Sequence, residues 1–316
     1  MDKRKSYEDV QYTMKKFLSF VEIQTKLATF FPFLAALAYV FYSVGNINLV
    51  STLLYIPAAL LLDMSVTAIN NHLDYREENL EPHYSNWAGF FIILLMLTIS
   101  AMLSLYLVYL HGFTLLIAGA FCFFIGITYT FGPAPISKSP YSEVASGFVA
   151  GTVIMFIVTT INNPSFRPLG LFFNYSEMFL MAAIDLPALI GFGLITLPAT
   201  FAASNISLAN NICDAEKDRT FRYTLVHHIG TSNGLKLFAA LYYAAYLAIV
   251  IASILGLIPL WSLTTLLTLI PVQRNIRLFY KKQVKSETFV PAVKNFVMIM
   301  LVYTLSMAIG GILYWI

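Results

Sequence analysis

Nine apolar stretches, each close to the length of a membrane-crossing helix, constrain this chain more than any other feature. A helix needs about 20 mostly apolar residues to cross the roughly 30 Å hydrocarbon layer of a bilayer. The predicted spans are 22–44, 49–71, 88–110, 113–131, 144–161, 189–211, 235–256, 259–278 and 294–315. Because 59% of the residues are hydrophobic and only 11% are charged, a soluble globule could not bury this apolar surface. The sequence therefore predicts an all-α integral membrane protein with nine transmembrane helices.

Residues 1–21 differ from the rest of the chain because they are polar and basic. This composition lacks the apolar core of a cleavable signal peptide, so we expect a cytoplasmic N-terminal arm. The apolar face of the arm is expected on the membrane surface and consists of Phe17, Leu18, Phe20 and Val21. Nothing divides residues 22–316, which makes them a single transmembrane domain.

The Lys and Arg residues are distributed unevenly between the two sides of the nine spans. Arg167 alone falls on one side, Lys26 lies inside the first span, and the others fall on the side of the N-terminus. The positive-inside rule then places the N-terminus in the cytoplasm and the C-terminus outside the plasma membrane. The net charge of +3 calls for no nucleic-acid partner, because the basic edge faces anionic headgroups and anionic substrates.

Two loops are given no part in the chemistry. Residues 162–187 are expected to form a long, aromatic-rich loop on the outer side. A cytoplasmic loop near the eighth span is expected to anchor that edge to lipid headgroups through Arg274, Arg277, Lys281, Lys282 and Lys285.

A dense set of ligand-type side chains begins where the sixth span ends. On a helix, positions i, i+4 and i+8 share one face, so Asn210, Asp214 and Asp218 are expected to form a single stripe. Like charges at this spacing repel each other, which indicates a bound cation. Oxygen ligands alone favour a hard cation, so Mg²⁺ is the expected metal.

The same spacing occurs once more upstream, in Asn70, Asp74 and Glu78. Each copy lies at the cytoplasmic end of an apolar span, so the two copies are expected to face each other across a central cavity that opens to the cytoplasm. Two facing acidic stripes can hold metal ions against a diphosphate. The expected metal ligands are Asp74, Glu78, Asp214 and Asp218.

Basic and aromatic side chains accompany the two motifs. Tyr129 ends the fourth span, and Lys138 follows it in a loop that glycine and prolines stiffen. Tyr129 is either part of an interfacial aromatic belt or part of the lining of the site. Arg219 and Arg222 follow the second motif and can clamp a phosphate group.

Lys26 has two interpretations. It can form an ion pair with Glu22, four residues earlier on the same helix, or it can reach into the site as a diphosphate contact. The sequence leaves both open.

The motifs resemble those of a known family. Asn70-Asn71-x-x-Asp74-x-x-x-Glu78 resembles the first aspartate-rich motif of UbiA-type intramembrane prenyltransferases, and Asp214-x-x-x-Asp218 is similar to their second. Within that family, Asn210-Asn211-x-x-Asp214-x-x-x-Asp218-Arg219 and Tyr129-Thr130-x-Gly132-Pro133-x-Pro135 resemble the 1,4-dihydroxy-2-naphthoate polyprenyltransferase branch. Asn71 and Glu78 depart from the pattern, since the family has Asp at both positions, so the first metal site is expected to be weaker or differently filled.

The resemblance implies an enzyme that uses Mg²⁺ to transfer a polyprenyl group from a polyprenyl diphosphate to an aromatic acceptor. With dihydroxynaphthoate as acceptor, CO₂ and diphosphate leave and the product is demethylmenaquinone. The catalytic residues would be Asp74, Asp214, Asp218 and Tyr129, whose π face can stabilise an allylic cation. The substrates would contact Asn70, Asn71, Lys26, Lys138, Asn210, Asn211, Arg219 and Arg222.

Other functions stay open at this point. Relatives with similar donor sites use 4-hydroxybenzoate, homogentisate or haem as the acceptor. A cation-coupled transporter also places Asp and Asn within a membrane, although such proteins use interrupted helices with acidic residues at mid-depth. A non-catalytic scaffold would not need the second acidic stripe.

Overall fold

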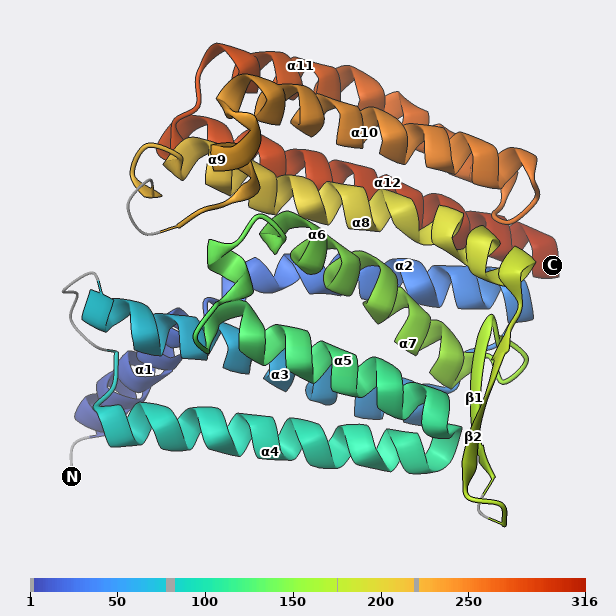
Figure 1. The fold of residues 1–316 in the computed structure, drawn as a ribbon, viewed down its shortest axis with the longest axis horizontal. Helices are drawn as coiled ribbons and strands as arrows, with labels where there is room; N and C mark the ends of the chain where they lie inside the picture. The colour runs from blue at the N-terminus through green and yellow to red at the C-terminus, as the bar shows by residue number, and fades with distance from the viewer. Residues whose placement is uncertain (1–2, 78–82, 175, 219–221) are drawn as a thin grey trace.

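The structure is a computed structural model that describes residues 3–77, 83–174, 176–218 and 222–316. Its long helices lie side by side in one bundle (Figure 1). These helices are α2 (Leu27–Val44), α3 (Leu49–Glu77), α4 (Asn86–His111), α5 (Phe113–Thr130), α6 (Ser142–Gly147) with α7 (Ile154–Asn162), α8 (Leu186–Asp214), α10 (Thr231–Ile254), α11 (Leu269–Lys281) and α12 (Val290–Trp315). The N and C labels lie at opposite ends of this bundle.

Eight helical segments in the described residues are long and apolar enough to cross a membrane. They correspond to eight of the predicted spans, and the chain is a multi-pass membrane protein. The predicted span 259–278 is instead a 3₁₀ segment, Leu260–Thr268, followed by α11. Gln273, Arg274 and Arg277 make α11 too polar for a span by composition, so the count of nine is not confirmed.

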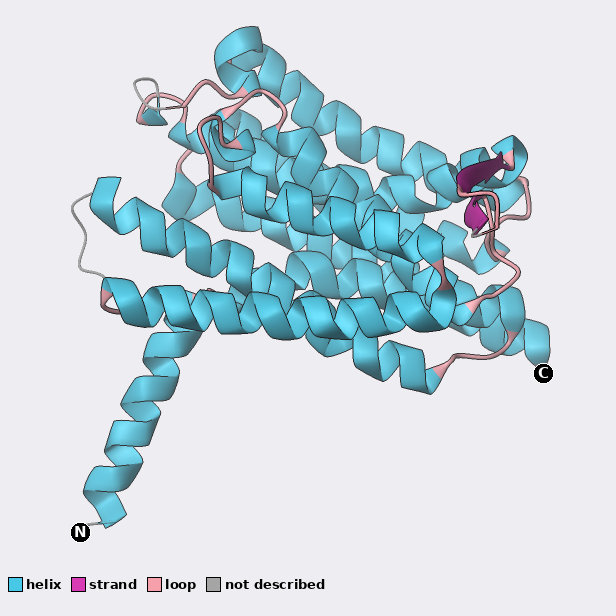
Figure 2. Ribbon diagram, turned by 60° about the horizontal axis from the view of Figure 1, so that its bottom comes forward, coloured by secondary structure: helices cyan, strands magenta, loops and turns pink. Residues whose placement is uncertain are grey.

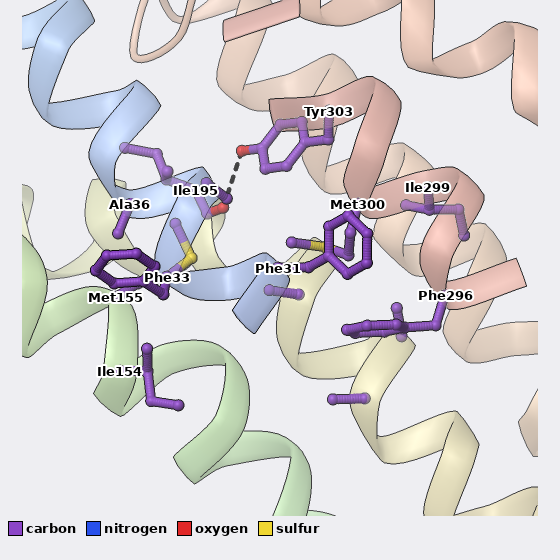
Figure 3. Packing of buried hydrophobic residues seen from close by; sticks show 14 of the residues in the cluster. Phe31, Phe33, Ala36, Ile154, Met155, Ile195, Phe296, Ile299, Met300 and Tyr303 are labelled. Atoms are coloured by element: carbon purple, nitrogen blue, oxygen red, sulfur yellow. Dashed lines mark hydrogen bonds between the residues drawn. The ribbon is translucent and has the colours of Figure 1, made fainter. Parts of the chain in front are cut away.

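The main core lies where α2, α7, α8 and α12 meet. Figure 3 shows Phe31 and Phe33 from α2, Met155 from α7 and Phe296 from α12 in this cluster. The Tyr303 hydroxyl donates a hydrogen bond to the Ile195 carbonyl oxygen at 2.9 Å. Because the hydroxyl is satisfied, this large aromatic ring is buried without leaving an unpaired polar group.

The joint between α6 and α7 is a π-helical turn, Phe148–Val153, that packs closely on α8. A Cβ atom at Gly151 would lie 2.3 Å from the Thr200 backbone nitrogen, and one at Gly147 would lie 1.9 Å from Ser204 Oγ. Only glycine permits this approach, as small residues generally do where membrane helices pack. The close packing brings the start of α6 against the end of α8.

The N-terminal helix α1 (Lys3–Phe20) projects away from the bundle, as Figure 2 shows. Its end does not lie on the membrane surface as expected, because Phe20 and Val21 are buried against Met64 and Ile93 in a second apolar cluster. The chain turns here from the arm into α2, and this turn brings both side chains between α3 and α4.

A β-hairpin occupies part of the segment 162–187 that was expected to be a long, aromatic-rich loop. Strands β1 (Leu169–Asn174) and β2 (Phe179–Ile184) pair antiparallel, with Leu169 opposite Ile184. In Figure 1 the hairpin lies at the end of the bundle where the C label lies, which we call the hairpin end. The opposite end, where α3 and α8 finish, is the motif end.

Candidate active site

A polar cavity of about 550 Å³ opens at the motif end. Its walls come from the ends of α3 and α5, the loop after α5 and the segment that follows the second motif. The lining residues are Asn70, Leu73, Thr130, Phe131, Gly132, Pro133, Pro135, Ser137, Lys138 and Arg222. Three residues predicted to bind substrate, Asn70, Lys138 and Arg222, therefore share one cavity.

Backbone hydrogen bonds hold the walls of this cavity together. Lys138 ends a short 3₁₀ turn, Ile136–Lys138, and its carbonyl oxygen accepts a hydrogen bond from the Tyr223 backbone N–H at 2.9 Å. The Arg222 backbone N–H donates to the Asp218 carbonyl oxygen, also at 2.9 Å. The loop after α5 and the chain after α8 are thus joined, although they are far apart in the sequence.

The second motif is not one continuous helical stripe. Helix α8 ends at Asp214, so Asp218 lies in the turn beyond the helix and not one further turn along it. The turn is held by His227, whose Nε2 lies 2.9 Å from the Ala215 carbonyl oxygen. The expected alignment of Asn210, Asp214 and Asp218 on one face therefore stops at Asp214.

Both carboxylates of the second motif have cationic neighbours. Lys285 Nζ lies 2.6 Å from Asp214 Oδ2, and Arg222 Nε lies 3.9 Å from Asp218 Oδ2. The Asp214 and Asp218 side chains are only 17% and 14% exposed, so the cations offset much of the cost of holding the charges there. Lys285 was expected to contact headgroups, and that expectation was wrong.

The first motif keeps its helical form further along the chain. Helix α3 continues to Glu77, so Asn70 and the Asp74 backbone lie on one unbroken helix. The Asp74 side chain, together with the whole of Glu78 and Arg219, lies outside the described residues. That the two acidic stripes face each other therefore stays a prediction, while Asn70 does face the Arg222 segment across the polar cavity.

The second asparagine of each motif is bonded away from the cavity. Asn71 Nδ2 donates to the Phe20 carbonyl oxygen at 3.0 Å, which ties α3 to the arm. Asn211 Nδ2 donates to Glu143 Oε1 at 2.8 Å inside the bundle. Asn210 is half-buried on the last turns of α8. The substrate-binding roles of these three residues stay predictions.

Glu143 is a buried carboxylate that the sequence analysis did not identify. It is 3% exposed, and its Oε2 accepts a hydrogen bond from the Ser142 hydroxyl at 3.0 Å. The signal that could have identified Glu143 is its place as an acidic residue immediately before an apolar span. With Asn211, it fixes the end of α8 against the start of α6.

A second, apolar cavity of about 490 Å³ runs beside the first. It is lined by α3, α4, α5 and the α6–α7 segment, and along α5 it extends from Leu115 to Tyr129. At 1.5 Å per residue this is about 20 Å of helix. Leu105, which is 58% exposed, also lines the cavity. The cavity therefore reaches the outer, lipid-facing surface of the bundle.

The two cavities adjoin the same end of α5, residues 129–131, which we call the junction. Tyr129 is its first residue. It lines the apolar cavity, whereas the next two residues, Thr130 and Phe131, line the polar one. This position favours the interpretation that Tyr129 lines the site over the interpretation that it belongs to an interfacial aromatic belt. Neighbouring positions at one helix end therefore line an apolar space and a polar space.

Lys26 pairs with Asp63 and not with Glu22. Its ammonium group is buried and lies 2.9 Å from Asp63 Oδ1 and 2.5 Å from Thr67 Oγ1. An ion pair between Glu22 and Lys26 requires a continuous helix, but Glu22 has φ = 45° at the start of a 3₁₀ turn, Ile23–Lys26. Lys26 is also absent from the lining of the polar cavity.

Asp63 was missed although it carries a clear signal. It is the one acidic residue inside the apolar segment 49–71, and an ionisable residue in a membrane span indicates function by default. Both Asp63 and Thr29 line the apolar cavity. An acidic residue therefore lies inside a span, whereas the two predicted motifs lie at span ends.

No protein-family model matches the chain. It is 29% identical over 171 residues to a 1,4-dihydroxy-2-naphthoate octaprenyltransferase of Bacillus subtilis (strain 168). The match covers 54% of this chain and 48% of that protein, so it spans about half the length of this curated relative.

Solved structures match over nearly the whole chain. A UbiA homologue from Archaeoglobus fulgidus bound to DMAPP and Mg²⁺ gives a TM-score of 0.61 at 13% identity, over 93% of this chain and 99% of that one. The chain has the UbiA-type fold. An apo UbiA homologue from Aeropyrum pernix K1 gives 0.62 at 17% identity, over 92% and 98% of the two chains. A digeranylgeranylglyceryl phosphate synthase gives 0.62 at 15% identity, over 95% and 98%.

The UbiA-type fold confirms the fold that the two motifs led us to expect. The described side chains contain no group of three or more His, Cys, Asp or Glu residues placed to hold a metal ion. Mg²⁺ is usually bound by one or two carboxylates together with substrate phosphates. Neither Asp214 nor Asp218 lines the polar cavity, but Arg222 lines it and lies 3.9 Å from Asp218. Asp218 is therefore the described carboxylate that best fits that kind of site.

Proposed function

We propose that this chain is a Mg²⁺-dependent prenyltransferase that moves a polyprenyl group from its diphosphate to an aromatic acceptor. The observation that carries the proposal is that an apolar and a polar cavity adjoin consecutive residues at the end of α5, Tyr129 and Thr130, within the UbiA-type fold. A polyprenyl diphosphate has the same division into an anionic head and an apolar tail. Structures with this fold have been determined with DMAPP and with GPP, each with Mg²⁺.

In this proposal the diphosphate occupies the polar cavity. Lys138 and Arg222 line that cavity and bind the phosphate oxygens by charge and by hydrogen bonds. Mg²⁺, when bound, neutralises the diphosphate as the allylic C–O bond ionises. Asp214 and Asp218 would hold the metal, and Asp74, Glu78 and Arg219 would complete the site by their positions in the two motifs.

The chain's own cations hold the acidic ligands in place. Lys285 Nζ lies 2.6 Å from Asp214 Oδ2 and Arg222 Nε lies 3.9 Å from Asp218 Oδ2, so these cations balance the two carboxylates and compete with a metal ion for them. Arg222, which also lines the polar cavity, can at the same time stabilise negative charge on a phosphate group there.

The apolar cavity holds the isoprenoid tail or the acceptor ring and excludes water from the allylic cation. Exclusion is needed because water would convert the cation to a polyprenol. The ring of Tyr129 at the junction can stabilise the cation through its π face. The acceptor ring carbon then attacks the cation, and diphosphate is released.

The proposed acceptor is 1,4-dihydroxy-2-naphthoate. The support is the Bacillus subtilis relative at 29% identity and the motif resemblance. On this acceptor the prenyl group replaces the carboxylate, which leaves as CO₂, and the product is demethylmenaquinone in its reduced form. The main alternative is a prenyltransferase for 4-hydroxybenzoate or a similar ring.

The test is the mass of the product made by membranes that contain this chain. They are incubated with Mg²⁺, geranylgeranyl diphosphate and a mixture of dihydroxynaphthoate and 4-hydroxybenzoate, with Asp218→Asn membranes as the control. A prenylated naphthalene that lacks the carboxylate is expected. A prenylated hydroxybenzoate would replace the acceptor, and no Mg²⁺-dependent product with either ring would contradict the proposal.

A further inference from the structure

The ion pair between Lys26 and Asp63 has no part in the diphosphate chemistry described above. It lies inside the membrane-spanning part of the bundle and away from the polar cavity. The Lys26 side chain is 7% exposed and the Asp63 side chain 24% exposed. The carboxylate is therefore the member of the pair that meets open space, and that space is the apolar cavity, which Asp63 lines.

The carboxylate is held in one orientation from two sides. Asp63 Oδ1 accepts a hydrogen bond from Lys26 Nζ at 2.9 Å, and Oδ2 accepts one from Thr29 Oγ1 at 2.8 Å. Lys26 is itself fixed by Thr67 Oγ1 and by the Asp63 carbonyl oxygen. An ionised carboxylate offers about four lone-pair positions, so these two bonds leave capacity for another donor.

An ion pair at this position does not serve stability well. Removing two charges from water costs about as much as their attraction returns, and apolar residues of similar volume are often equally stable. Ionisable residues inside membrane spans are rare and usually mark a functional site. The pair therefore points to a ligand that needs a hydrogen-bond acceptor in apolar surroundings.

The chemistry of the cavity selects among the two substrates of the proposed reaction. An isoprenoid tail has no hydrogen-bond donor, and a carboxylate beside it would gain nothing. A hydroxylated aromatic ring has a donor and an apolar body, and the aromatic rings of Tyr55, Phe123 and Tyr129 are in the cavity wall. An anionic substituent on the same ring would be repelled by Asp63 and would lie away from it.

The position along α3 agrees with this choice. Asp63 and Asn70 are seven residues apart, which is about 10 Å of helix. Asn70 lines the polar cavity, where the diphosphate would lie. A ring whose hydroxyl group contacts Asp63 would therefore extend toward the junction, where its carbon atoms can meet the allylic carbon.

We propose that Asp63, held by Lys26 and Thr29, binds a hydroxyl group of the aromatic acceptor, and that the neighbouring part of the apolar cavity is the acceptor subsite. This inference rests on the proposed function, since it assigns the aromatic acceptor of that reaction to the part of the apolar cavity beside Asp63. It makes Asp63 a binding residue for the ring and not a metal ligand.

The experiment compares two probes that differ in one hydrogen-bond donor, 1-naphthol and 1-methoxynaphthalene, by calorimetric titration of the purified chain in detergent. The wild-type chain is expected to bind 1-naphthol about 10- to 100-fold more tightly, which is the range for a hydrogen bond to a charged group. Asp63→Asn should remove most of this preference, and Thr29→Val part of it. Ser104→Ala removes another polar side chain of the cavity wall and should leave the preference unchanged.

Asp63→Asn leaves Lys26 without its charged partner and can therefore destabilise the fold. A second variant tests the subsite without leaving a buried unpaired charge. The double variant Lys26→Met with Asp63→Leu removes both charges together and should also lose the preference for 1-naphthol. Equal weakening of both probes in Asp63→Asn would assign Asp63 a structural role and overturn the subsite. No preference for 1-naphthol in the wild-type chain would overturn it as well.

Binding of geranylgeranyl diphosphate with Mg²⁺ is measured on the same samples. A wild-type chain that binds this donor but shows no hydroxyl preference would overturn the subsite alone. A chain that shows the preference, loses it in Asp63→Asn and never binds the donor would overturn the proposed function, and with it the description of the ligand as an acceptor.

Discussion

The two motifs have the same spacing in the sequence, yet they end their helices differently. Helix α3 runs on to Glu77, past its Asn70 and Asp74, whereas α8 stops at Asp214 and leaves Asp218 in a turn. The first motif therefore meets the polar cavity with the side of a helix. The second meets it with a helix end and the chain that follows, which brings Arg222 to the cavity as well.

The motifs are also anchored in different places. Asn71 bonds to the carbonyl oxygen of Phe20 near the arm, and Asn211 bonds to the buried carboxylate of Glu143. One anchor is a neutral contact at the edge of the bundle, and the other is a charge-assisted contact in its interior. Equal spacing thus says little about how firmly each motif is held.

The largest expected effect comes from the acidic residues of the second motif. Asp214→Ala or Asp218→Ala should lower prenyl transfer by about 100-fold or more, because a carboxylate that holds the metal against the diphosphate is lost. Turnover of geranylgeranyl diphosphate is measured at saturating Mg²⁺, and the unfolding temperature in detergent checks the fold. Full turnover in both variants would remove the metal-binding role of this motif.

The next effect tests the interior anchor. Glu143→Leu leaves the Asn211 amide and the Ser142 hydroxyl without their buried acceptor, which should cost about 1–3 kcal/mol for each unsatisfied group. The unfolding temperature in detergent should fall by several degrees. Glu143→Gln keeps one acceptor oxygen and is the matched control with a smaller decrease. An unchanged unfolding temperature in Glu143→Leu would show that this contact does not anchor α8.

A smaller effect is expected at the other anchor. Asn71→Ala removes one neutral hydrogen bond at a half-buried position, which should cost about 1 kcal/mol. The same thermal measurement applies, and Asn71→Asp tests whether the donor is needed. A loss as large as that of Glu143→Leu would show that the two anchors contribute equally to stability.

The smallest effect on stability is expected at Lys285. Its side chain is 53% exposed, and exposed ion pairs contribute about 0–1 kcal/mol, so Lys285→Met should unfold at nearly the wild-type temperature. Removal of a cation beside Asp214 should lower the Mg²⁺ concentration needed for half-maximal donor binding. Lys282→Met, whose partner is Glu287, is the matched control and should leave this concentration unchanged.

Eight of the nine span positions, the helical course of α3 through Asp74 and the gathering of Asn70, Lys138 and Arg222 at one end were accessible from the sequence. They depend on local properties, namely the length of apolar runs and the ends of those runs. The β-hairpin was missed because residues 169–184 carry no polar alternation that separates a strand pair from an aromatic loop. Lys285 was misassigned because its partner is 71 positions away along the chain.

The sequence alone determined a helical membrane bundle with two motifs of ligand-type side chains at the ends of two spans. A long apolar segment in a bilayer must satisfy its backbone hydrogen bonds internally, which leaves a chain few choices other than a helix. Only the tertiary structure decided which charges meet. Lys26 pairs with Asp63 and not with Glu22, because the backbone turns at Glu22 and α3 lies alongside. Partner choice depends on packing between helices, and spacing within one helix cannot specify it.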